Sequence, residues 1–289
     1  MIKSKKSKVG DLVVAFFCFL LILVCLLPML NVLARSLSAS EALIKNKVWL
    51  WPVGLNLDAY KLVLNDTKYT WSLVWTAILT VIGTCLSLFM TTICAYPLTY
   101  DKLKGRRIIN TIIIFTMYFS AGTIPMYLLL KELDFLNRPV VLVVPYCLSV
   151  FNMIIMRSFF YGIPESLRES AELDGAGPVR VLVSIYLPMS TPVIATLALF
   201  YAVGRWNGFS DSLTFMKKRE YYVIQHLLYL IINSMSNIEV TTQEGFSPPG
   251  LSETLKSATV MFATVPILFV YPWLQRYFIT GATLGAIKE

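Results

Sequence analysis

The sequence is short of charge, of histidine and of paired cysteine. Only 15% of its 289 residues are charged, whereas soluble domains carry about 25%. Hydrophobic residues make up 56% of the chain. This deficit argues against an ordinary soluble domain and indicates a membrane protein. The net charge of +8 is therefore attributed to lysine and arginine that flank membrane spans, and not to a surface for nucleic acid.

Groups for catalysis and metal binding are equally scarce. The single histidine, His226, cannot build a metal site alone. Five cysteines lie inside apolar runs without a CxxC pair, which favours buried thiols over disulfides or metal ligands. They are Cys18, Cys25, Cys85, Cys94 and Cys147. No GxxxxGK[ST] loop occurs, so ATP is not bound by that device. A membrane enzyme is therefore disfavoured.

Long uncharged runs dominate what the sequence does contain. A helix needs about 20 residues to cross the hydrocarbon of a bilayer. We predict an all-α membrane protein with six transmembrane helices and one permease domain overall. The spans are expected at 12–34, 69–97, 108–130, 139–157, 189–208 and 257–276. No Asp or Glu lies deep in any of them, which argues against a cation-coupled carrier.

Lysine and arginine near the span ends give the orientation. The N-tail, residues 1–11, is rich in lysine, and the turn "DKLKGRR" between the second and third spans is basic. Both are predicted to be cytoplasmic, because short segments dense in positive charge stay inside. With six spans the C-tail, 277–289, is cytoplasmic too. The segments 35–68 and 209–256 are then outer loops, and 158–188 is a cytoplasmic loop.

Two alternatives concern the number of spans. The N-terminus could be a cleaved signal peptide with "SLSAS" as its cleavage site, but the uncharged run 12–34 is longer than a usual signal core. The run 221–238 could be a seventh span, which would move the C-terminus outside. Apolar residues recur there at amphipathic helical spacing, so an interfacial or partly inserted outer helix is favoured. They are Ile224, Leu227, Leu228 and Ile231.

A charged insert, "ESLRESAELDGAG" at 165–177, separates two apolar runs. Pro164 suits a first helical position, and Glu165 in the first turn complements the helix dipole. Gly175 suits the stop of this helix, because glycine accepts a left-handed φ cheaply. Pro178 opens a second short helix that ends near Pro188. A helix of about 11 residues is too short to be stable alone and needs a partner, although an ordinary solvated loop is the alternative.

The stretch "ESAELDGAGPVRVLVSIYLP" resembles the EAA loop of binding-protein-dependent ABC importer permeases. The family pattern is Glu-Ala-Ala, three residues, Gly, and after nine residues Ile-x-Leu-Pro. The matching positions are Glu169, Ser170, Ala171, Gly175, Ile185, Leu187 and Pro188. Ser170 departs from alanine, but it is also small. "LNLDAYKLVL", "RSFFYGIPESLRESAELDGAG" and "YPWLQRYFITGATLGAIKE" resemble the carbohydrate-uptake branch of maltose-permease type, and the last two its oligosaccharide subgroup.

This resemblance covers nearly the whole chain and implies the fold and the partners. It implies the type I permease fold of ABC importers, in a bacterial cytoplasmic membrane with both termini cytoplasmic. The chain would translocate a sugar, expected to be an oligosaccharide, without being an enzyme and without a cofactor of its own, since ATP and Mg bind the partner ATPase. The implied partners are two ATPase subunits, a second similar permease chain, an extracytoplasmic sugar-binding protein and membrane lipid, but no nucleic acid. A permease for a non-sugar solute, or an independent carrier or channel, is the alternative.

Three sets of residues are expected to carry this function. The ATPase-coupling set implied by the resemblance is Glu169, Ser170, Ala171, Asp174, Gly175, Ile185, Leu187 and Pro188. The resemblance also implies an ATPase contact by the C-tail residues Gly281, Gly285 and Lys288. Aromatic and amide side chains near mid-bilayer or the outer mouth are candidates for the sugar pathway. They are Tyr118, Tyr127, Asn152, Tyr201, Trp206 and Asn207.

Overall fold

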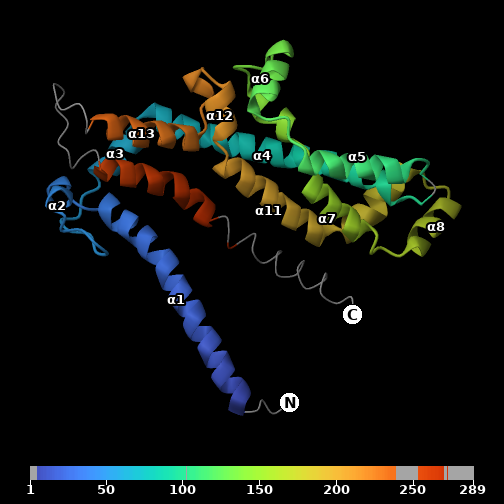
Figure 1. Ribbon diagram of the computed structural model, residues 1–289, viewed down its shortest axis with the longest axis horizontal. Coiled ribbons are helices and arrows are strands. Elements are labelled where there is room, and N and C mark those ends of the chain that lie inside the picture. The colour runs from blue at the N-terminus through green and yellow to red at the C-terminus, as the bar shows by residue number, and fades with distance from the viewer. Residues whose placement is uncertain (1–4, 102, 239–252, 270–271, 273–289) are drawn as a thin grey trace. The chain divides into compact units, whose positions relative to one another are not determined.

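The computed structural model describes residues 5–101, 103–238, 253–269 and 272, and these are helical with short connections (Figure 1). No strand occurs among them, and an isolated bridge pairs Ser38 with Leu55. The all-α prediction is confirmed for this part of the chain. Where one domain was expected, the contacts divide the chain into two compact units, 1–70 with 227–265 and 71–226 with 266–289.

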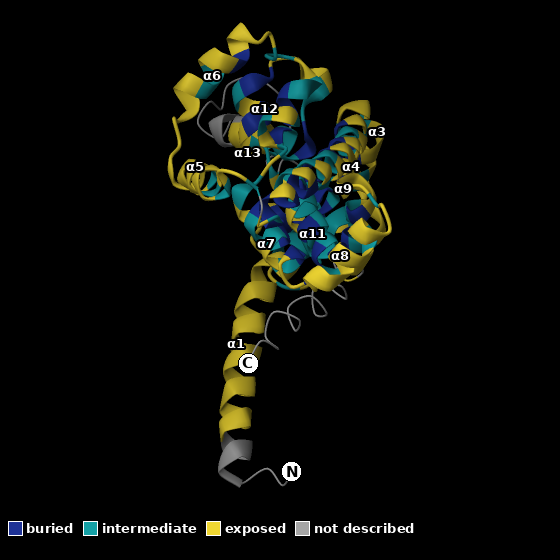
Figure 2. Ribbon diagram, turned by 90° about the vertical axis from the view of Figure 1, so that its right-hand side faces the viewer, coloured by how far each residue is buried: buried dark blue, intermediate teal, exposed yellow. Residues whose placement is uncertain are grey.

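The first unit begins with the long apolar helix α1 (Lys5–Ser36). None of the side chains in its most apolar 18 residues is buried, and Figure 2 shows α1 exposed along most of its length. After α1 the chain turns back. The Ser38 hydroxyl donates to the Ala34 carbonyl at 2.6 Å, and Arg35 forms an ion pair with Glu253 of the last helix, 253–269. Two short helices, α2 (Ser40–Ile44) and α3 (Asp58–Asn65), follow in the segment 35–68.

The second unit is organised around α4 (Thr67–Ala95), which matches the predicted span 69–97 and continues into η1 (Pro97–Thr99). Its buried positions are mostly small and polar, including Ser72, Thr76, Gly83, Ser87 and Thr91. Small residues let neighbouring helices approach closely in a membrane, where packing and hydrogen bonds replace the hydrophobic drive. The Thr76 hydroxyl also accepts the Ile224 backbone N–H at 2.8 Å.

The third predicted span is broken in the structure. The run 108–130 forms α5 (Arg106–Tyr118) and α6 (Thr123–Glu132), which are bent by 113° (Figure 1). Between them Gly122 has φ +88°, a conformation that favours glycine. The small and polar stretch "SAGT" at 120–123 and Pro125 interrupt the apolar run at this point, but the predicted span runs through them without a break.

The fourth predicted span, 139–157, is also bent, whereas the fifth, 189–208, is matched by the single helix α11 (Thr191–Asn207). Short 3-10 helices, η2 (Pro139–Leu142) and η3 (Val144–Tyr146), lead into α7 (Val150–Phe160) at 47°. Further on, the helical run Pro178–Met189 meets α11 (Thr191–Asn207) at 82°. The remaining elements are α12 (Ser210–Phe215), η5 (Arg219–Tyr221) and α13 (Ile224–Ile238). α13 falls within the predicted outer helix 221–238.

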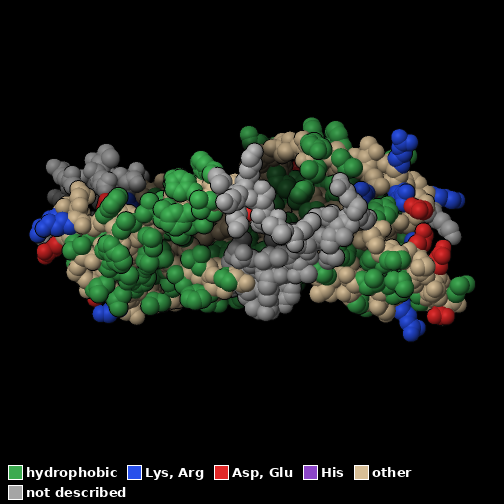
Figure 3. Space-filling model, turned by 90° about the horizontal axis from the view of Figure 1, so that it is seen from below, with side chains coloured by type: hydrophobic (Ala, Val, Ile, Leu, Met, Phe, Trp, Pro, Cys, Tyr) green, Lys and Arg blue, Asp and Glu red, His purple; other side chains and the backbone are tan. Residues whose placement is uncertain are grey.

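By length and composition, two described helices could cross a membrane, or up to five if each bent pair is one span. The sixth predicted span, 257–276, starts in the last described helix and ends outside the described residues. Figure 3 shows large patches of hydrophobic side chains on the surface, with most charged side chains gathered apart from them. An apolar surface of this extent fits a lipid environment.

Two buried clusters hold the second unit together. One, the tyrosine cluster, contains Tyr96, Met153, Met156, Phe160 and Tyr186 at its centre. The other joins α4, α6 and α12 through Leu79, Leu130, Val141, Leu142 and Phe215. The first cluster includes residues of the EAA-like loop, and the second includes Leu142 and Phe215 beside the turn into α12, so each supports one of the candidate sites.

Candidate functional site

The charged insert forms the helix α8 (Glu165–Leu173), with Pro164 just outside its first turn. Gly175 adopts φ +81°. The Gly175 N–H donates to the Glu172 carbonyl at 3.0 Å and the Ala176 N–H to the Ala171 carbonyl at 2.9 Å. These two bonds form a Schellman motif, in which a left-handed residue closes the helix. The predicted helix and its glycine stop are confirmed.

The predicted coupling side chains lie mostly on the surface of this helix. Glu169, Ser170 and Asp174 are exposed and Ala171 is half-buried. Two apolar side chains stand beside them at the tip: Leu173 is 89% exposed, and Val179 of the next helix is 75% exposed. Sequence reasoning missed both, although apolar residues that flank a glycine turn on a polar loop are a readable signal. A surface with acidic sides and an apolar tip can dock in a cleft of another protein.

The second half of the motif contains an irregular helix. α9 (Pro178–Val181) runs into a π-helical turn, η4 (Leu182–Tyr186), and then into α10 (Leu187–Met189). The Leu187 N–H bonds to the Leu182 carbonyl, five residues back. Pro188 follows directly and has no N–H to donate. The wider π-helical turn therefore ends where proline would interrupt regular helical hydrogen bonding. Ile185 and Leu187 are half-buried, and Pro188 is exposed.

One charged side chain of α8 is buried. Arg168 pairs with Glu165 and lies at ion-pair distance from Glu172. Burial is the largest single influence and opposes its charge, but Glu165, Tyr186, Glu172 and Tyr100 together outweigh it, so the pKa of Arg168 is raised. The burial of Arg168 was not foreseen, because it depends on aromatic residues far away along the chain.

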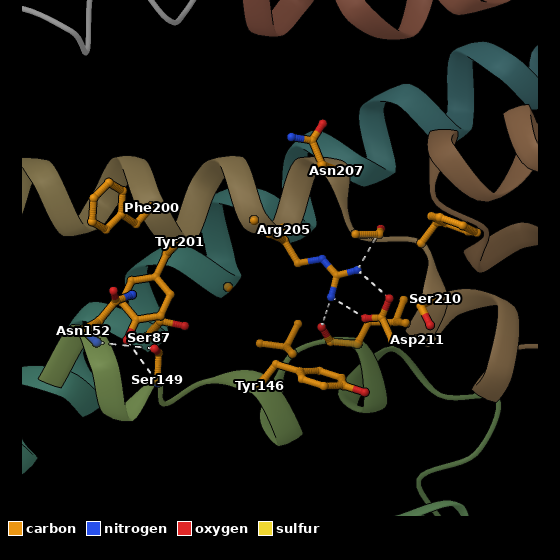
Figure 4. Close-up of a pocket in the computed structure, with 16 residues that line it drawn as sticks. Ser87, Tyr146, Ser149, Asn152, Phe200, Tyr201, Arg205, Asn207, Ser210 and Asp211 are labelled. Atoms are coloured by element: carbon orange, nitrogen blue, oxygen red, sulfur yellow. Dashed lines mark hydrogen bonds and ion pairs between the residues drawn. The ribbon is translucent and has the colours of Figure 1, made fainter. Parts of the chain in front are cut away.

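A second candidate site is a cavity of about 640 Å³ between α4, η2, α7, α11 and α12 (Figure 4). Three of the predicted pathway residues line it: Asn152, Tyr201 and Asn207. The Tyr201 hydroxyl pairs with that of Thr91 at 2.6 Å and accepts the Ser149 N–H at 3.2 Å. Amide and hydroxyl groups around a cavity can exchange hydrogen bonds with the hydroxyls of a sugar.

Arg205 and Asp211 form the charged part of this cavity, which the sequence reasoning missed. Arg205 donates to both carboxylate oxygens of Asp211 and to the Leu142 carbonyl at 2.6 Å. Their side chains are only 10% and 9% exposed. Arg205 is the one charged residue in the predicted span 189–208, and that could have pointed to the pair.

The other predicted pathway residues do not line this cavity. Tyr118 is 80% exposed at the end of α5. Tyr127 stacks on Phe215, with ring centroids 6.2 Å apart, within the buried cluster that contains Leu79 and Leu142. Trp206 lines a separate apolar cavity of about 380 Å³. The C-tail residues Gly281, Gly285 and Lys288 lie outside the described residues.

His226 is buried beside the second site. Its Nδ1 lies 2.9 Å from the Ser212 hydroxyl, and its ring stacks on Tyr222. Burial lowers the pKa of His226, while Asp211 opposes this shift. Within the described part of the chain no group of three His, Cys, Asp or Glu side chains could hold a metal ion.

Comparison with known proteins gives consistent matches over most of the chain. Residues 83–283 match the family described as "Binding-protein-dependent transport system inner membrane component". Two Bacillus subtilis proteins are similar. "Polygalacturonan/rhamnogalacturonan transport system permease protein YtcP" is 36% identical over 284 residues, 98% of this chain and 99% of that protein. "Protein LplC" is 36% identical over 290 residues, 100% of this chain and 98% of that protein.

A solved structure is also similar to the fold. It is described as "Crystal structure of a bacterial ABC transporter involved in the import of the acidic polysaccharide alginate". The TM-score is 0.85 at 29% sequence identity, and the match covers 96% of this chain and 99% of that chain. The charged insert and the residues that line the 640 Å³ cavity all lie within residues 83–283, which match the family.

Proposed function

Because the chain belongs to the family of binding-protein-dependent transport system inner membrane components, we propose that it carries an oligosaccharide across a bacterial cytoplasmic membrane by alternating access. The family resemblance seen in the sequence is thereby confirmed. The chain is a non-catalytic membrane subunit, and ATP hydrolysis belongs to a separate chain. ATP and Mg bind that chain, and no cofactor is assigned to this one.

We also propose that the separate ATPase docks on α8 and thereby drives transport. The observation that supports this coupling is the geometry of α8. A short helix with exposed Glu169 and Asp174, an apolar tip at Leu173 and a rigid glycine stop is a preformed docking element. Preformed elements bind tightly because little conformational entropy is lost on docking. Glu169 can accept charge-assisted hydrogen bonds from a basic residue of the ATPase cleft. The half-buried Ile185 and Leu187 join this element to α11.

The cavity lined by Asn152, Tyr201 and Asn207 is the proposed sugar pathway. The oligosaccharide class is supported by the names of relatives. One is a polygalacturonan/rhamnogalacturonan permease protein, and others are named as permease proteins for arabinooligosaccharides. The similar solved transporter is described as importing alginate. These substrates are all chains of sugars, which share hydroxyls and ring faces as recognition groups.

The proposed assembly contains this chain, a second similar permease chain, two ATPase subunits and an extracytoplasmic sugar-binding protein. A second solved structure, of the same fold, is of an alginate transporter in complex with an alginate-bound periplasmic protein. Both termini of the chain are proposed to be cytoplasmic, with six spans. The dense basic turn before α5 supports this orientation.

Copurification followed by transport measurement tests the proposal. The tagged chain is coexpressed with the ATPase, the second permease and the binding protein encoded in its own genome. We expect it to retain both partner subunits and, in proteoliposomes, to hydrolyse ATP faster when the binding protein and a short oligosaccharide are present. Oligogalacturonides and maltooligosaccharides serve as acidic and neutral probes, and an amino acid serves as the non-sugar control. A chain that retains no ATPase, or transports the control alone, would contradict the proposal.

A further inference from the structure

α8 is anchored by a charged side chain where an apolar one would be expected. Arg168 is the only buried residue of this nine-residue helix. It is 9% exposed, whereas Leu167 beside it is 40% exposed and Leu173 is 89% exposed. A short amphipathic helix normally packs its leucines against the protein. The burial of arginine in their place indicates that this position needs the interactions of a guanidinium group. The helix keeps its leucines outside and places its arginine inside.

The buried guanidinium rests on an aromatic ring. The Cζ atom of Arg168 lies 4.6 Å from the centre of the Tyr100 ring, within the range of a cation–π interaction. The side chain also pairs with Glu165, and Nε lies 3.6 Å from a carboxylate oxygen of Glu172. That distance is too long for a hydrogen bond, and Nε has no hydrogen-bond partner. Arg168 therefore has specific partners for a terminal nitrogen and for the face of its guanidinium, while Nε makes no hydrogen bond.

Tyr100 belongs to the cytoplasmic end of the chain segment that contains α4. Its hydroxyl lies 2.5 Å from that of Tyr96, and the two rings meet edge to face. Tyr96 makes further edge-to-face contacts with Phe160 of α7 and with Tyr186 of the π-helical turn, at centroid distances of 6.3 and 5.0 Å. The contacts form an unbroken path from α8 through Arg168 to α4, α7 and η4.

A buried charge makes this path resistant to slipping. An apolar side chain can slide over an aromatic surface with little change in energy, because dispersion contacts are replaced as they are lost. A guanidinium that leaves its ring and its carboxylates inside a protein loses interactions that nothing nearby replaces. When α8 is displaced, Tyr100 and Tyr96 are therefore expected to move with it.

We propose that Arg168 is a positioning residue that transmits displacement of α8 to the cytoplasmic end of α4 through the face of Tyr100. The inference rests on the proposed function, in which an ATPase displaces α8. Arg168 does not itself contact the sugar or ATP. Its role is to keep the docking helix and the span moving as one body, so that hydrolysis is converted into transport.

The test uses the complete importer in proteoliposomes, with a short oligogalacturonide and a maltooligosaccharide as probes. The variants are R168M, R168K, Y100L and Y100F, and the matched control is R138M, which removes an exposed arginine paired with Asp134. The readouts are retention of the ATPase on the tagged chain and sugar transported per ATP hydrolysed. For assembled R168M we expect roughly a tenfold lower ratio of transport to hydrolysis, within the usual range of coupling between sites. R168K keeps the cation over the ring and should lie nearer to wild type.

The tyrosine variants separate coupling from folding. Y100L removes the ring without changing α8 and should lower the ratio as R168M does, whereas Y100F keeps the ring and should not. If R168M fails to assemble, this pair decides the question. A normal ratio of transport to hydrolysis in an assembled R168M or Y100L importer would overturn the inference. So would a fall of this ratio in Y100F or R138M as large as that in R168M. A wild-type chain that retains no ATPase would instead overturn the proposed function.

Discussion

Arg205, near the end of α11, donates from its two terminal guanidinium nitrogens to Asp211 in the first turn of α12, one nitrogen to each carboxylate oxygen, and both side chains are about nine-tenths buried. The same guanidinium bonds to the Leu142 carbonyl. A two-pronged pair of this kind fixes geometry as well as charge. It holds the end of α11, the turn into α12 and η2 around one cavity.

Removing one partner of this pair should destabilise the protein strongly. D211A leaves the Arg205 charge buried without compensation, and such losses cost about 3–5 kcal/mol. Thermal unfolding in detergent should show a clear fall in midpoint. The double variant R205M/D211L removes both charges and should recover most of the loss. A double variant as unstable as D211A would show that the pair is not the cause.

A small substitution at Gly175 should lower stability slightly and leave coupling intact, whereas a bulky one should prevent docking of the ATPase. The backbone conformation at this position, with φ +81°, costs a non-glycine L-residue about 1–2 kcal/mol of folding free energy. Asparagine adopts it more readily than most residues. No atom lies within 4 Å of an added Cβ, so the chain itself does not obstruct a side chain. We expect G175N to keep coupled transport and G175W, at similar stability, to lose ATPase docking. Copurification and sugar-stimulated hydrolysis measure this, and unchanged docking in G175W would contradict the placement of the ATPase at this turn.

The single histidine should make the fold weaker in acid. Burial lowers the pKa of His226 below its ordinary value of 6.5, so the unfolded chain binds the proton more readily than the folded one. The stabilising contribution is complete above pH 6.5 and is lost as the pH falls below 6.5 toward the lowered pKa. Unfolding midpoints of wild type and H226Q, compared across this window, should show a steeper acid loss in wild type. Parallel curves would contradict the assignment.

Two neighbouring residues of α11 line different cavities, so they allow a direct test of the sugar pathway. Asn207 lines the polar cavity, while Trp206 lines the apolar one. If sugar passes through the polar cavity, N152A/N207A should raise the half-saturation concentration for transport by roughly tenfold, equivalent to one or two lost hydrogen bonds. W206A, as control, should affect stability more than half-saturation. The reverse pattern in proteoliposome uptake would move the pathway to the apolar cavity.

Local signals in the sequence were sufficient for the coupling helix and for α4. Pro164, Gly175 and the charges between them define α8 within a residue or two, because caps and stops act over a few residues. The uncharged run after 69 similarly gives α4. The resemblance then supplied the partner that a short helix requires.

The bends and the buried charges could not be foreseen in the same way. The 82° turn at Ser190 and the break at Gly122 fall at stretches with Gly, Ser, Thr or Pro, but such residues also occur inside continuous membrane helices, so the angle between the helices depends on tertiary packing. The place of Arg168 depends on Tyr100, and that of Thr76 on Ile224. Such pairings arise from tertiary packing, which a local pattern does not contain.

The break between α5 and α6 has a consequence for hydration. A helix end leaves backbone groups without intrahelical partners, and here the turn offers few replacements: the Gly122 N–H reaches the Ser120 hydroxyl at 3.3 Å, and the Phe119 N–H reaches the Phe115 carbonyl at 3.1 Å. Hydrocarbon supplies no hydrogen bonds to the remaining groups. The remaining backbone groups of the bend therefore require water or polar groups of another protein chain, so we expect this bend to face water or a protein surface instead of lipid.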